Sequence, residues 1–154
     1  MIFISGSLIL VAVGGNFYTD KCQVVDTKST NPCTDLASYP DSIGWATGRL
    51  IDDSPLICAG NYPYNPNPGS TCHKYDRNSN SWNLHATLSP QRTYMASVEL
   101  DGALFLIGGD LGNPHGHTSR ATEYVYPNGS VISGPDLPPG AQAGWIYLFI
   151  WIQT

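Results

Sequence analysis

The stretch Leu104–Asp110 reads LFLIGGD, an apolar run that ends in two adjacent glycines and an acid. Similar stretches occur earlier in the chain, as VAVGG at Val11–Gly15 and as LICAG at Leu56–Gly60. One such run is weak support for any fold, because many strands stop where glycine supplies backbone angles that other residues avoid. Three of them indicate an internal repeat.

The period of this repeat is close to 50 residues. The glycine-terminated runs end at Gly15, Gly60 and Gly109, which are 45 and 49 positions apart. A step of 50 positions also separates three further pairs, which are Cys22 and Cys72, Asp26 and Asp76, and Pro40 and Pro90. Because different residue types recur with nearly the same step, the repeat covers whole structural units.

Each repeat consists of short β-like segments joined by turn residues. In the third repeat, strand-like runs at 94–100 and 103–109 flank Asp101 and Gly102, and runs at 122–126 and 131–137 flank Asn128 and Gly129. Asp-Gly and Asn-Gly are favoured two-residue turns of β-hairpins. Four strands joined in sequence by hairpins form one antiparallel sheet. The sequence therefore predicts an all-β fold built from repeated four-stranded sheets.

The composition disfavours several other classes of protein. Only 12% of the 154 residues are charged, while 16 Gly and 12 Pro supply turns, and this disfavours a helical bundle. The formal net charge is -5 and no basic cluster is visible, which argues against a nucleic-acid partner.

The apolar ends of the chain are interpreted as structure. No Lys or Arg precedes the apolar residues near the N-terminus, so we do not interpret them as a signal peptide. The run of eight apolar residues at Trp145–Ile152 is far shorter than the ~20 residues that cross a bilayer as a helix. We expect a strand there and no membrane span.

These features resemble the kelch repeat, in which an apolar strand ends in a glycine pair and is followed by a Tyr and then a Trp. The resemblance extends from about Leu8 to Pro139, and Arg92 after Pro90 resembles the Arg of the family's P-x-x-R-x-x pattern. The matching residues are Gly14 and Gly15 in the first repeat, Ala59, Gly60, Tyr75 and Trp82 in the second, and Gly108, Gly109 and Tyr124 in the third.

The match is degenerate in places. The first repeat has Val25 and Pro32 where Tyr and Trp would lie, the third has no Trp, and Ala59 replaces the first glycine of its pair. The resemblance implies a kelch-type β-propeller. In that fold we expect the glycines at the end of each second strand to allow neighbouring blades to approach closely around the central channel.

A closed propeller has about 4 to 8 blades, and with about 50 residues per blade it needs at least ~200 residues. The chain has 154 residues and is too short for a closed ring. We assign one blade to about residues 1–40, one to 41–90 and one to 91–139, with 140–154 as the start of a further blade. The chain is thus expected to be a partial propeller. The remaining blades of a longer protein, which we favour, or edge-to-edge self-association of copies would cover the open ends.

The resemblance implies a non-catalytic protein–protein interaction module without a cofactor. Alternating strand direction places the loops after the second and fourth strands of each blade on one face. Aromatic side chains and Arg are typical of protein-binding hot spots. The residues that we expect to bind a protein partner are Phe17, Tyr18, Tyr62, Tyr64, Asn65, Arg92, His115, His117 and Arg120.

The sequence of these loops contains little that points to metal binding or catalysis. His115 and His117 could share a metal ion, but no third ligand is evident beyond Asp110, so we predict no metal site. No G-x-S-x-G motif is present, and we do not expect an enzyme.

Two alternatives to a non-catalytic interaction module remain open. One is a fragment of a galactose-oxidase-like or carbohydrate-active propeller enzyme, which a co-purifying metal would reveal, and the other is a substrate-recruiting ubiquitin-ligase adaptor that lacks its BTB domain.

The four cysteines contain no C-x-x-C pair, which disfavours a zinc ribbon or a thioredoxin-like site. The blade assignment places Cys22 beside Cys33 and Cys58 beside Cys72 on neighbouring strands, so we predict two disulfides. This favours a secreted or extracellular protein over a cytoplasmic one with four thiols. The sequon at Asn128–Ser130 fits a secretory route, but Asn-Gly is equally a tight hairpin turn.

Overall fold

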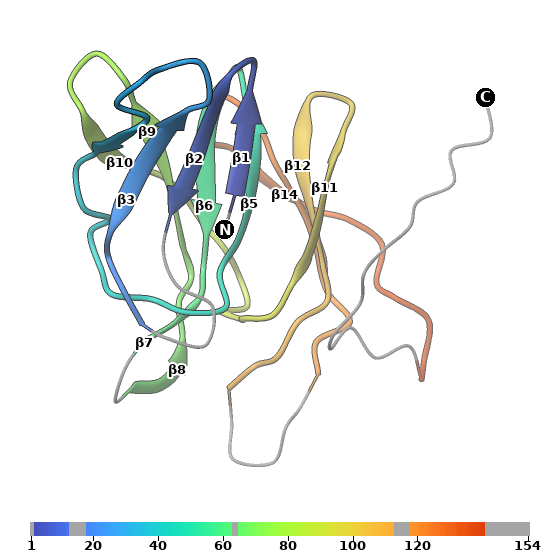
Figure 1. Ribbon diagram of the computed structural model, residues 1–154. Coiled ribbons are helices and arrows are strands. Elements are labelled where there is room, and N and C mark those ends of the chain that lie inside the picture. Colours follow the sequence, from blue (N-terminus) through green and yellow to red (C-terminus); the bar gives the residue numbers. More distant parts are fainter. Residues whose placement is uncertain (1, 13–17, 63–64, 113–117, 141–154) are drawn as a thin grey trace.

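The computed structural model describes residues 2–12, 18–62, 65–112 and 118–140 of the chain. Within these ranges the protein consists of strands, turns and loops, as Figure 1 shows. The all-β prediction is confirmed. The described part of the chain has no helix that is long and apolar enough to cross a membrane.

Three four-stranded antiparallel sheets follow one another along the chain. The first sheet consists of β1 (Ile2–Ser5), β2 (Leu8–Ala12), β3 (Cys22–Asp26) and β4 (Cys33–Asp35). The second consists of β5 (Thr47–Ile51), β6 (Ser54–Cys58), β9 (Thr71–Asp76) and β10 (Ser81–Thr87), and a small hairpin of β7 (Asn61–Tyr62) and β8 (Asn65–Pro68) extends between β6 and β9. The third consists of β11 (Ala96–Leu100), β12 (Ala103–Ile107), β13 (Thr122–Val125) and β14 (Val131–Ser133).

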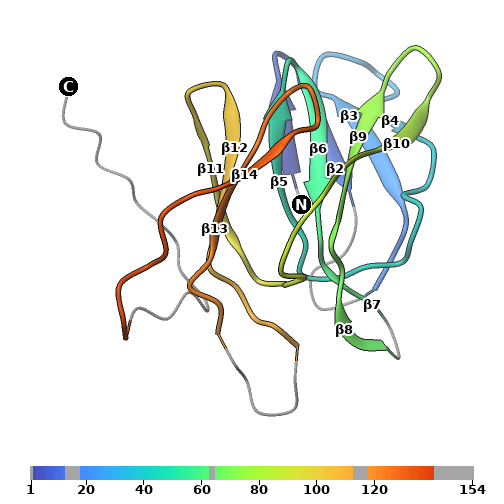
Figure 2. The same cartoon turned by 180° about the vertical axis from the view of Figure 1, so that it is seen from behind.

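The connections gather at two opposite ends of the molecule. The tight turns within the β1–β2, β3–β4, β5–β6, β9–β10, β11–β12 and β13–β14 pairs lie at one end, which we call the hairpin end (Figures 1 and 2). At the other end, which we call the loop end, lie strands β7 and β8, the described residues 108–112 and 118–121 between β12 and β13, and the linkers that enter β5 and β11. This arrangement follows from hairpin connection, because each strand reverses the direction of the one before it.

The glycines of the repeat allow two backbone segments of one sheet to meet at the loop end. Gly109 has a φ of +110°, and a Cβ atom there would lie 2.6 Å from the carbonyl oxygen of Thr93. Gly60 has a φ of +107°, and its Cβ atom would lie 3.0 Å from the carbonyl oxygen of Gly44. Thr93 and Gly44 belong to the segments that enter β11 and β5. The close approach is therefore within a sheet, and our expectation of a contact between neighbouring blades is corrected.

Tyr75 and Trp82 of the second repeat pack in the seam between the first and second sheets. Trp82 is 8% exposed, and its ring centroid lies 5.2 Å from that of Tyr75 and 5.2 Å from that of Tyr39. The indole Nε1 of Trp82 donates a hydrogen bond of 3.1 Å to the carbonyl of Ala37. Tyr39 and Ala37 belong to the linker between the first two sheets, so these aromatic contacts fix the path of the linker.

The interface between the second and third sheets is formed by fully buried apolar side chains. Leu56 and Cys58 from β6 pack with Leu104, Leu106 and Val125 from the third sheet, and all five are 0% exposed. The first strands of the two sheets also meet, because Thr47 Oγ1 of β5 donates a hydrogen bond of 2.7 Å to Ser97 Oγ of β11. The sheets therefore stack face to face with their first strands side by side.

Tyr124 does not occupy the position that Tyr75 occupies in the second sheet. Tyr124 lies opposite Phe105 in the β12–β13 pair, and the two rings stack with centroids 4.4 Å apart. Val125 instead is buried against the second sheet. Since successive side chains of a strand point to opposite faces, an offset of one residue sends the tyrosine to the other face. The sequence spacing from the glycine pair does not reveal this offset.

The cysteines form one disulfide in place of the two that we predicted. Cys58 and Cys72 are directly opposite each other in the β6–β9 pair and are bonded, with a Cα–Cα distance of 4.0 Å. Cys33 lies opposite Val25, three positions along β3 from Cys22, which is ~10 Å at the rise of a strand. That separation exceeds the ~7 Å over which a disulfide forms, so the prediction of a Cys22–Cys33 bond is wrong.

A Gly109→Ala substitution is expected to lower the free energy of unfolding by ~2–3 kcal/mol, because the methyl group meets the carbonyl of Thr93 and the backbone conformation is restricted to glycine. Gly102→Ala is the matched control, since Gly102 has a φ of +73° and no atom lies within 4 Å of the position that its Cβ would take. This control is expected to cost only ~1–2 kcal/mol. Urea unfolding measures both variants. An equal loss in the two would show that the contact with Thr93 is unimportant.

Alkylation in denaturant without reductant is expected to label two of the four cysteines, Cys22 and Cys33, and to label all four after reduction. In the folded protein the exposed Cys33 is expected to react before the buried Cys22. Removing the disulfide with Cys58→Ala and Cys72→Ala together is expected to cost ~3 kcal/mol, the value for a loop of this length. Peptide mass mapping that links Cys22 to Cys33 would contradict the structure.

Candidate binding surface at the loop end

Three aromatic side chains from three different segments meet at the loop end. The ring centroid of Trp45 lies 5.4 Å from that of Tyr18, edge to face, and 5.3 Å from that of Tyr94. Tyr18 is 37% exposed, and Trp45 and Tyr94 are half-buried. We call these three residues the aromatic cluster. Such rings are typical anchors of protein interfaces because they bury a large area and lose little conformational entropy.

Trp45 and Tyr94 occupy equivalent positions in consecutive repeats. Each lies two residues before the first strand of its sheet, and both have the left-handed conformation, with φ angles of 51° and 55°. Left-handed backbone is uncommon for bulky residues, and residues in such conformations concentrate at functional sites. The repetition indicates that the fold itself imposes this conformation where the chain turns into an inner strand.

Hydrogen bonds connect the two linkers that carry these rings. The carbonyl oxygen of Trp45 accepts a hydrogen bond of 3.0 Å from Thr93 Oγ1 and one of 3.4 Å from the backbone N–H of Tyr94. The backbone of Thr93 also exchanges hydrogen bonds with Asp110, at 2.9 Å and 2.7 Å. The backbones that carry Trp45 and Tyr94 are therefore held relative to each other, which favours a preorganised binding surface.

An acidic residue accompanies the cluster. Asp110 follows the glycine pair of the third repeat, and its Oδ1 accepts a hydrogen bond of 2.8 Å from the backbone N–H of Gly112. Burial raises the pKa of the Tyr94 phenol above its ordinary value of 10.0, and Tyr18 and Asp110 add to the shift. Tyr94 thus stays neutral at physiological pH. The cluster presents aromatic faces and hydroxyl groups beside a carboxylate.

Arg92 lies beneath this surface, although we expected it to be one of the exposed binding residues. Its side chain is 0% exposed. Nη2 donates to Glu123 Oε2 at 2.5 Å, Nη1 donates to the carbonyl of Ala121 at 2.6 Å, and Nε lies 3.0 Å from the sulfur of Met95. Burial lowers the pKa of the guanidinium, and the carboxylate of Glu123 acts in the opposite direction. Arg92 is a positioning residue that joins the linker before β11 to β13.

The other predicted binding residues divide into two groups. Arg120 is exposed, and its Nε donates a hydrogen bond of 2.5 Å to the carbonyl of Leu137. Tyr62 and Asn65 lie opposite each other in the β7–β8 hairpin at the loop end. Four predicted residues, Phe17, Tyr64, His115 and His117, lie outside the described residues, as do Gly14 and Gly15 of the first repeat.

Sequence reasoning missed Trp45 and Tyr94 as site residues. A signal for them was present, because aromatic residues recur at about the repeat step as Trp45, Tyr94 and Trp145. The proximity of Tyr18 to Trp45 could not be inferred, since it depends on how the first sheet packs against the second.

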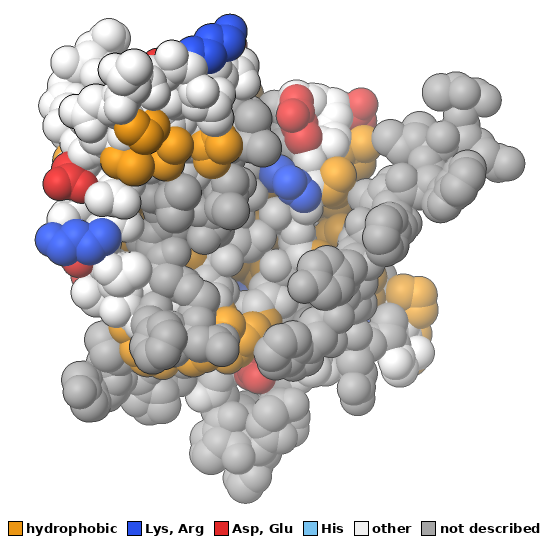
Figure 3. All heavy atoms as spheres, viewed as in Figure 1, with side chains coloured by type: hydrophobic (Ala, Val, Ile, Leu, Met, Phe, Trp, Pro, Cys, Tyr) orange, Lys and Arg blue, Asp and Glu red, His pale blue; other side chains and the backbone are white. Residues whose placement is uncertain are grey.

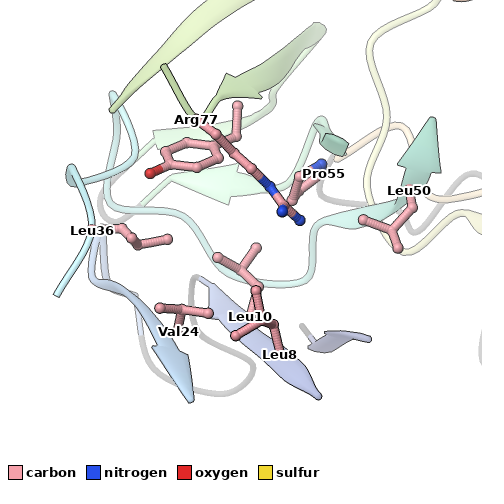
Figure 4. A pocket seen from close by; sticks show the side chains of 8 residues that line it. Leu8, Leu10, Val24, Leu36, Leu50, Pro55 and Arg77 are labelled. Carbon is pink, nitrogen blue, oxygen red and sulfur yellow. The ribbon is translucent and has the colours of Figure 1, made fainter. Parts of the chain in front are cut away.

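A concave region lies between the first and second sheets (Figure 4). It encloses about 220 Å³, and its lining residues are Leu8, Leu10, Val24, Leu36, Leu50, Pro55, Tyr75 and Arg77. Of these residues Arg77 alone is charged, so the cleft can accept an apolar group but has few polar groups to orient a ligand. Within the described residues, no three His, Cys, Asp or Glu side chains are grouped so that they could bind a metal ion.

No protein-family model matches the chain. Among solved structures, the chain is similar to one titled "Structure of YjhT", with a TM-score of 0.79 and 15% sequence identity. The match covers 93% of this chain and 52% of that protein, so this chain spans about half the length of its structural neighbour. At this identity the similarity concerns the fold alone.

A Glu123→Gln substitution is expected to lower the free energy of unfolding by ~3–5 kcal/mol, because it leaves the buried guanidinium of Arg92 without its counter-charge. The matched control is Lys74→Gln, which removes an ion pair of 3.2 Å to Asp52 at the surface, where the two side chains are 23% and 64% exposed. That change is expected to cost less than ~1 kcal/mol. Chemical denaturation measures both, and similar losses would refute the anchoring role of Arg92.

Proposed function

We propose that the chain is part of a kelch-type β-propeller and acts as a non-catalytic protein-interaction module. The observation that carries this proposal is the aromatic cluster, three partly exposed rings that pack together at the loop end, two of them on linkers joined by hydrogen bonds. Preorganised aromatic residues at a rigid surface are favourable anchors for a protein partner, because binding then costs little ordering entropy.

Several features of the fold support the propeller assignment. Three four-stranded antiparallel sheets are each connected in chain order, and β5 of the second sheet contacts β11 of the third. Stacked sheets with their first strands together are the arrangement of propeller blades around a channel. The remaining blades would come from a longer protein, and the solved structure that this chain matches is about twice its length.

The chemistry of the surface suggests the character of the partner segment. The cluster combines aromatic faces with Asp110, and the chain has a formal net charge of -5. In the side view of Figure 3, the charged side chains of the described residues are scattered and form no continuous basic patch. Aromatic rings attract both apolar groups and cations, and a nearby carboxylate favours cations. We therefore propose a partner segment that carries an apolar or aromatic side chain next to Lys or Arg.

An extracellular or secreted location is part of the proposal. The Cys58–Cys72 bond joins two fully buried cysteines on neighbouring strands. Disulfides of this kind form and persist in oxidising compartments and are rare in the cytosol. The exposed Cys33 is compatible with either setting.

Selection of peptides from a random display library on the immobilised full chain tests the binding function. Selected peptides are expected to carry an apolar residue beside a basic one. Their affinity is expected to fall at least ~10-fold with Tyr18→Ala and with Trp45→Asn, as for hot-spot residues. Asparagine suits position 45 because it tolerates the left-handed backbone. Biolayer interferometry measures the dissociation constants.

Leu84→Ala serves as the matched control, since Leu84 is an apolar residue of β10 that is 65% exposed. Its removal is expected to change affinity by no more than about twofold. Melting temperatures of all variants verify that each remains folded. Peptides that bind the Tyr18 and Trp45 variants as tightly as the wild type would place the binding surface elsewhere and overturn the proposal.

A further inference from the structure

The turn between β13 and β14 contains the motif Asn128-Gly129-Ser130 at the hairpin end. Asn128 is the one asparagine in the sequence that is followed two positions later by Ser or Thr with a residue other than Pro between them. This pattern is the acceptor motif for N-glycosylation. The same residues also form a tight turn, so the structure must show whether the asparagine is accessible.

Asn128 and Ser130 are both exposed, whereas Gly129 between them is half-buried. The Oδ1 atom of Asn128 accepts hydrogen bonds from the backbone N–H of Ser130 at 3.0 Å and from its hydroxyl at 2.8 Å. Both bonds use the carbonyl oxygen of the side-chain amide. Neither occupies Nδ2, which is the atom that carries a glycan.

The turn itself is fixed against the second sheet. A Cβ atom on Gly129 would lie 2.5 Å from the carbonyl oxygen of His85 in β10. Nε2 of His85 lies 2.9 Å from the carbonyl oxygen of Tyr126, and the backbone N–H of Gly129 donates to that same oxygen at 2.9 Å. The packed side of the turn is therefore its backbone at Gly129. A group attached to Asn128 would extend into solvent without displacing any of these contacts.

We propose that Asn128 is an N-glycosylation site when the chain enters the secretory pathway of a eukaryotic cell. The donor is an oligosaccharide linked through a diphosphate to a membrane lipid. In the transfer, Nδ2 forms a bond to the anomeric carbon of the first sugar and loses a proton to a base of the transferase. The bond from that carbon to the phosphate oxygen breaks, and the lipid diphosphate leaves with the electron pair.

Two further observations agree with this site. The Cys58–Cys72 bond is of a kind that forms and persists in oxidising compartments, and the lumen in which the oligosaccharide is transferred is such a compartment. Asn128 lies at the hairpin end, opposite the loop end that carries the aromatic cluster. A glycan there would shield the outer turns and leave the cluster accessible.

The test uses the full chain, fused to a cleavable secretory signal and produced in cultured animal cells. Intact mass is measured for protein from the medium and from the endoplasmic reticulum, because transfer takes place during translocation and is scored even for a variant that does not fold. We expect a mass increase that peptide N-glycosidase removes. Digestion in heavy-oxygen water labels the aspartate formed at position 128 and distinguishes it from deamidation of the Asn-Gly pair before the digestion, and a parallel incubation without the glycosidase measures deamidation during it.

Variants separate the motif from its surroundings. Asn128→Gln and Ser130→Ala are expected to abolish the glycosidase-sensitive mass, and Ser130→Thr is expected to retain it. Asn78→Gln is the matched control, since Asn78 is an exposed asparagine in the corresponding turn of the second sheet but is followed two positions later by Asn80. It is expected to leave the mass increase unchanged. Recovery of the Asn128 peptide without glycan from both fractions, or a mass increase that survives Asn128→Gln, would overturn the proposal.

Discussion

The contact between Gly109 and the backbone of Thr93 is the constraint on which the loop end depends. A Cβ atom at position 109 would lie 2.6 Å from the carbonyl oxygen of Thr93, so two main-chain segments meet there without a side chain between them. This closeness lets Thr93 and Asp110 exchange hydrogen bonds. Because Tyr94 follows Thr93 directly, the same contact determines where one ring of the aromatic cluster lies. The backbone of the repeat thus positions the surface residues.

Contacts within the third sheet hold the linker that carries Thr93. Arg92 joins the linker before β11 to β13 through its ion pair with Glu123 and its hydrogen bond to Ala121. The backbone N–H of Ser89 donates to the other carboxylate oxygen of Glu123 at 3.0 Å. A buried ion pair is tolerated when its remaining hydrogen-bonding groups are satisfied. These contacts restrict the linker at both of its ends, which supports a preorganised binding surface.

The two ends of the molecule differ in character. The hairpin end consists of tight turns with few residues between the strands. The Asn128 turn packs against β10 there through Gly129. Longer connections and the aromatic cluster occupy the loop end. Rigid sheets that present variable loops at one end are a common solution for recognition, because the frame is stable regardless of the loop sequence. The proposed partner and the proposed glycan would use opposite ends.

Much of the architecture could be predicted from the sequence, because hairpin turns and alternating apolar residues act locally. The repeat, the strands, the glycine-rich strand ends and the Cys58–Cys72 pair all follow from such local patterns. Three features could not be predicted: the register that separates Cys22 from Cys33, the one-residue offset that turns Tyr124 to the other face, and the burial of Arg92. Strand register and burial depend on contacts between segments far apart in the chain. The sequence by itself determined the units and their order, and only the packing of the sheets decided that Tyr18, Trp45 and Tyr94 meet, since each of the three comes from a different connection.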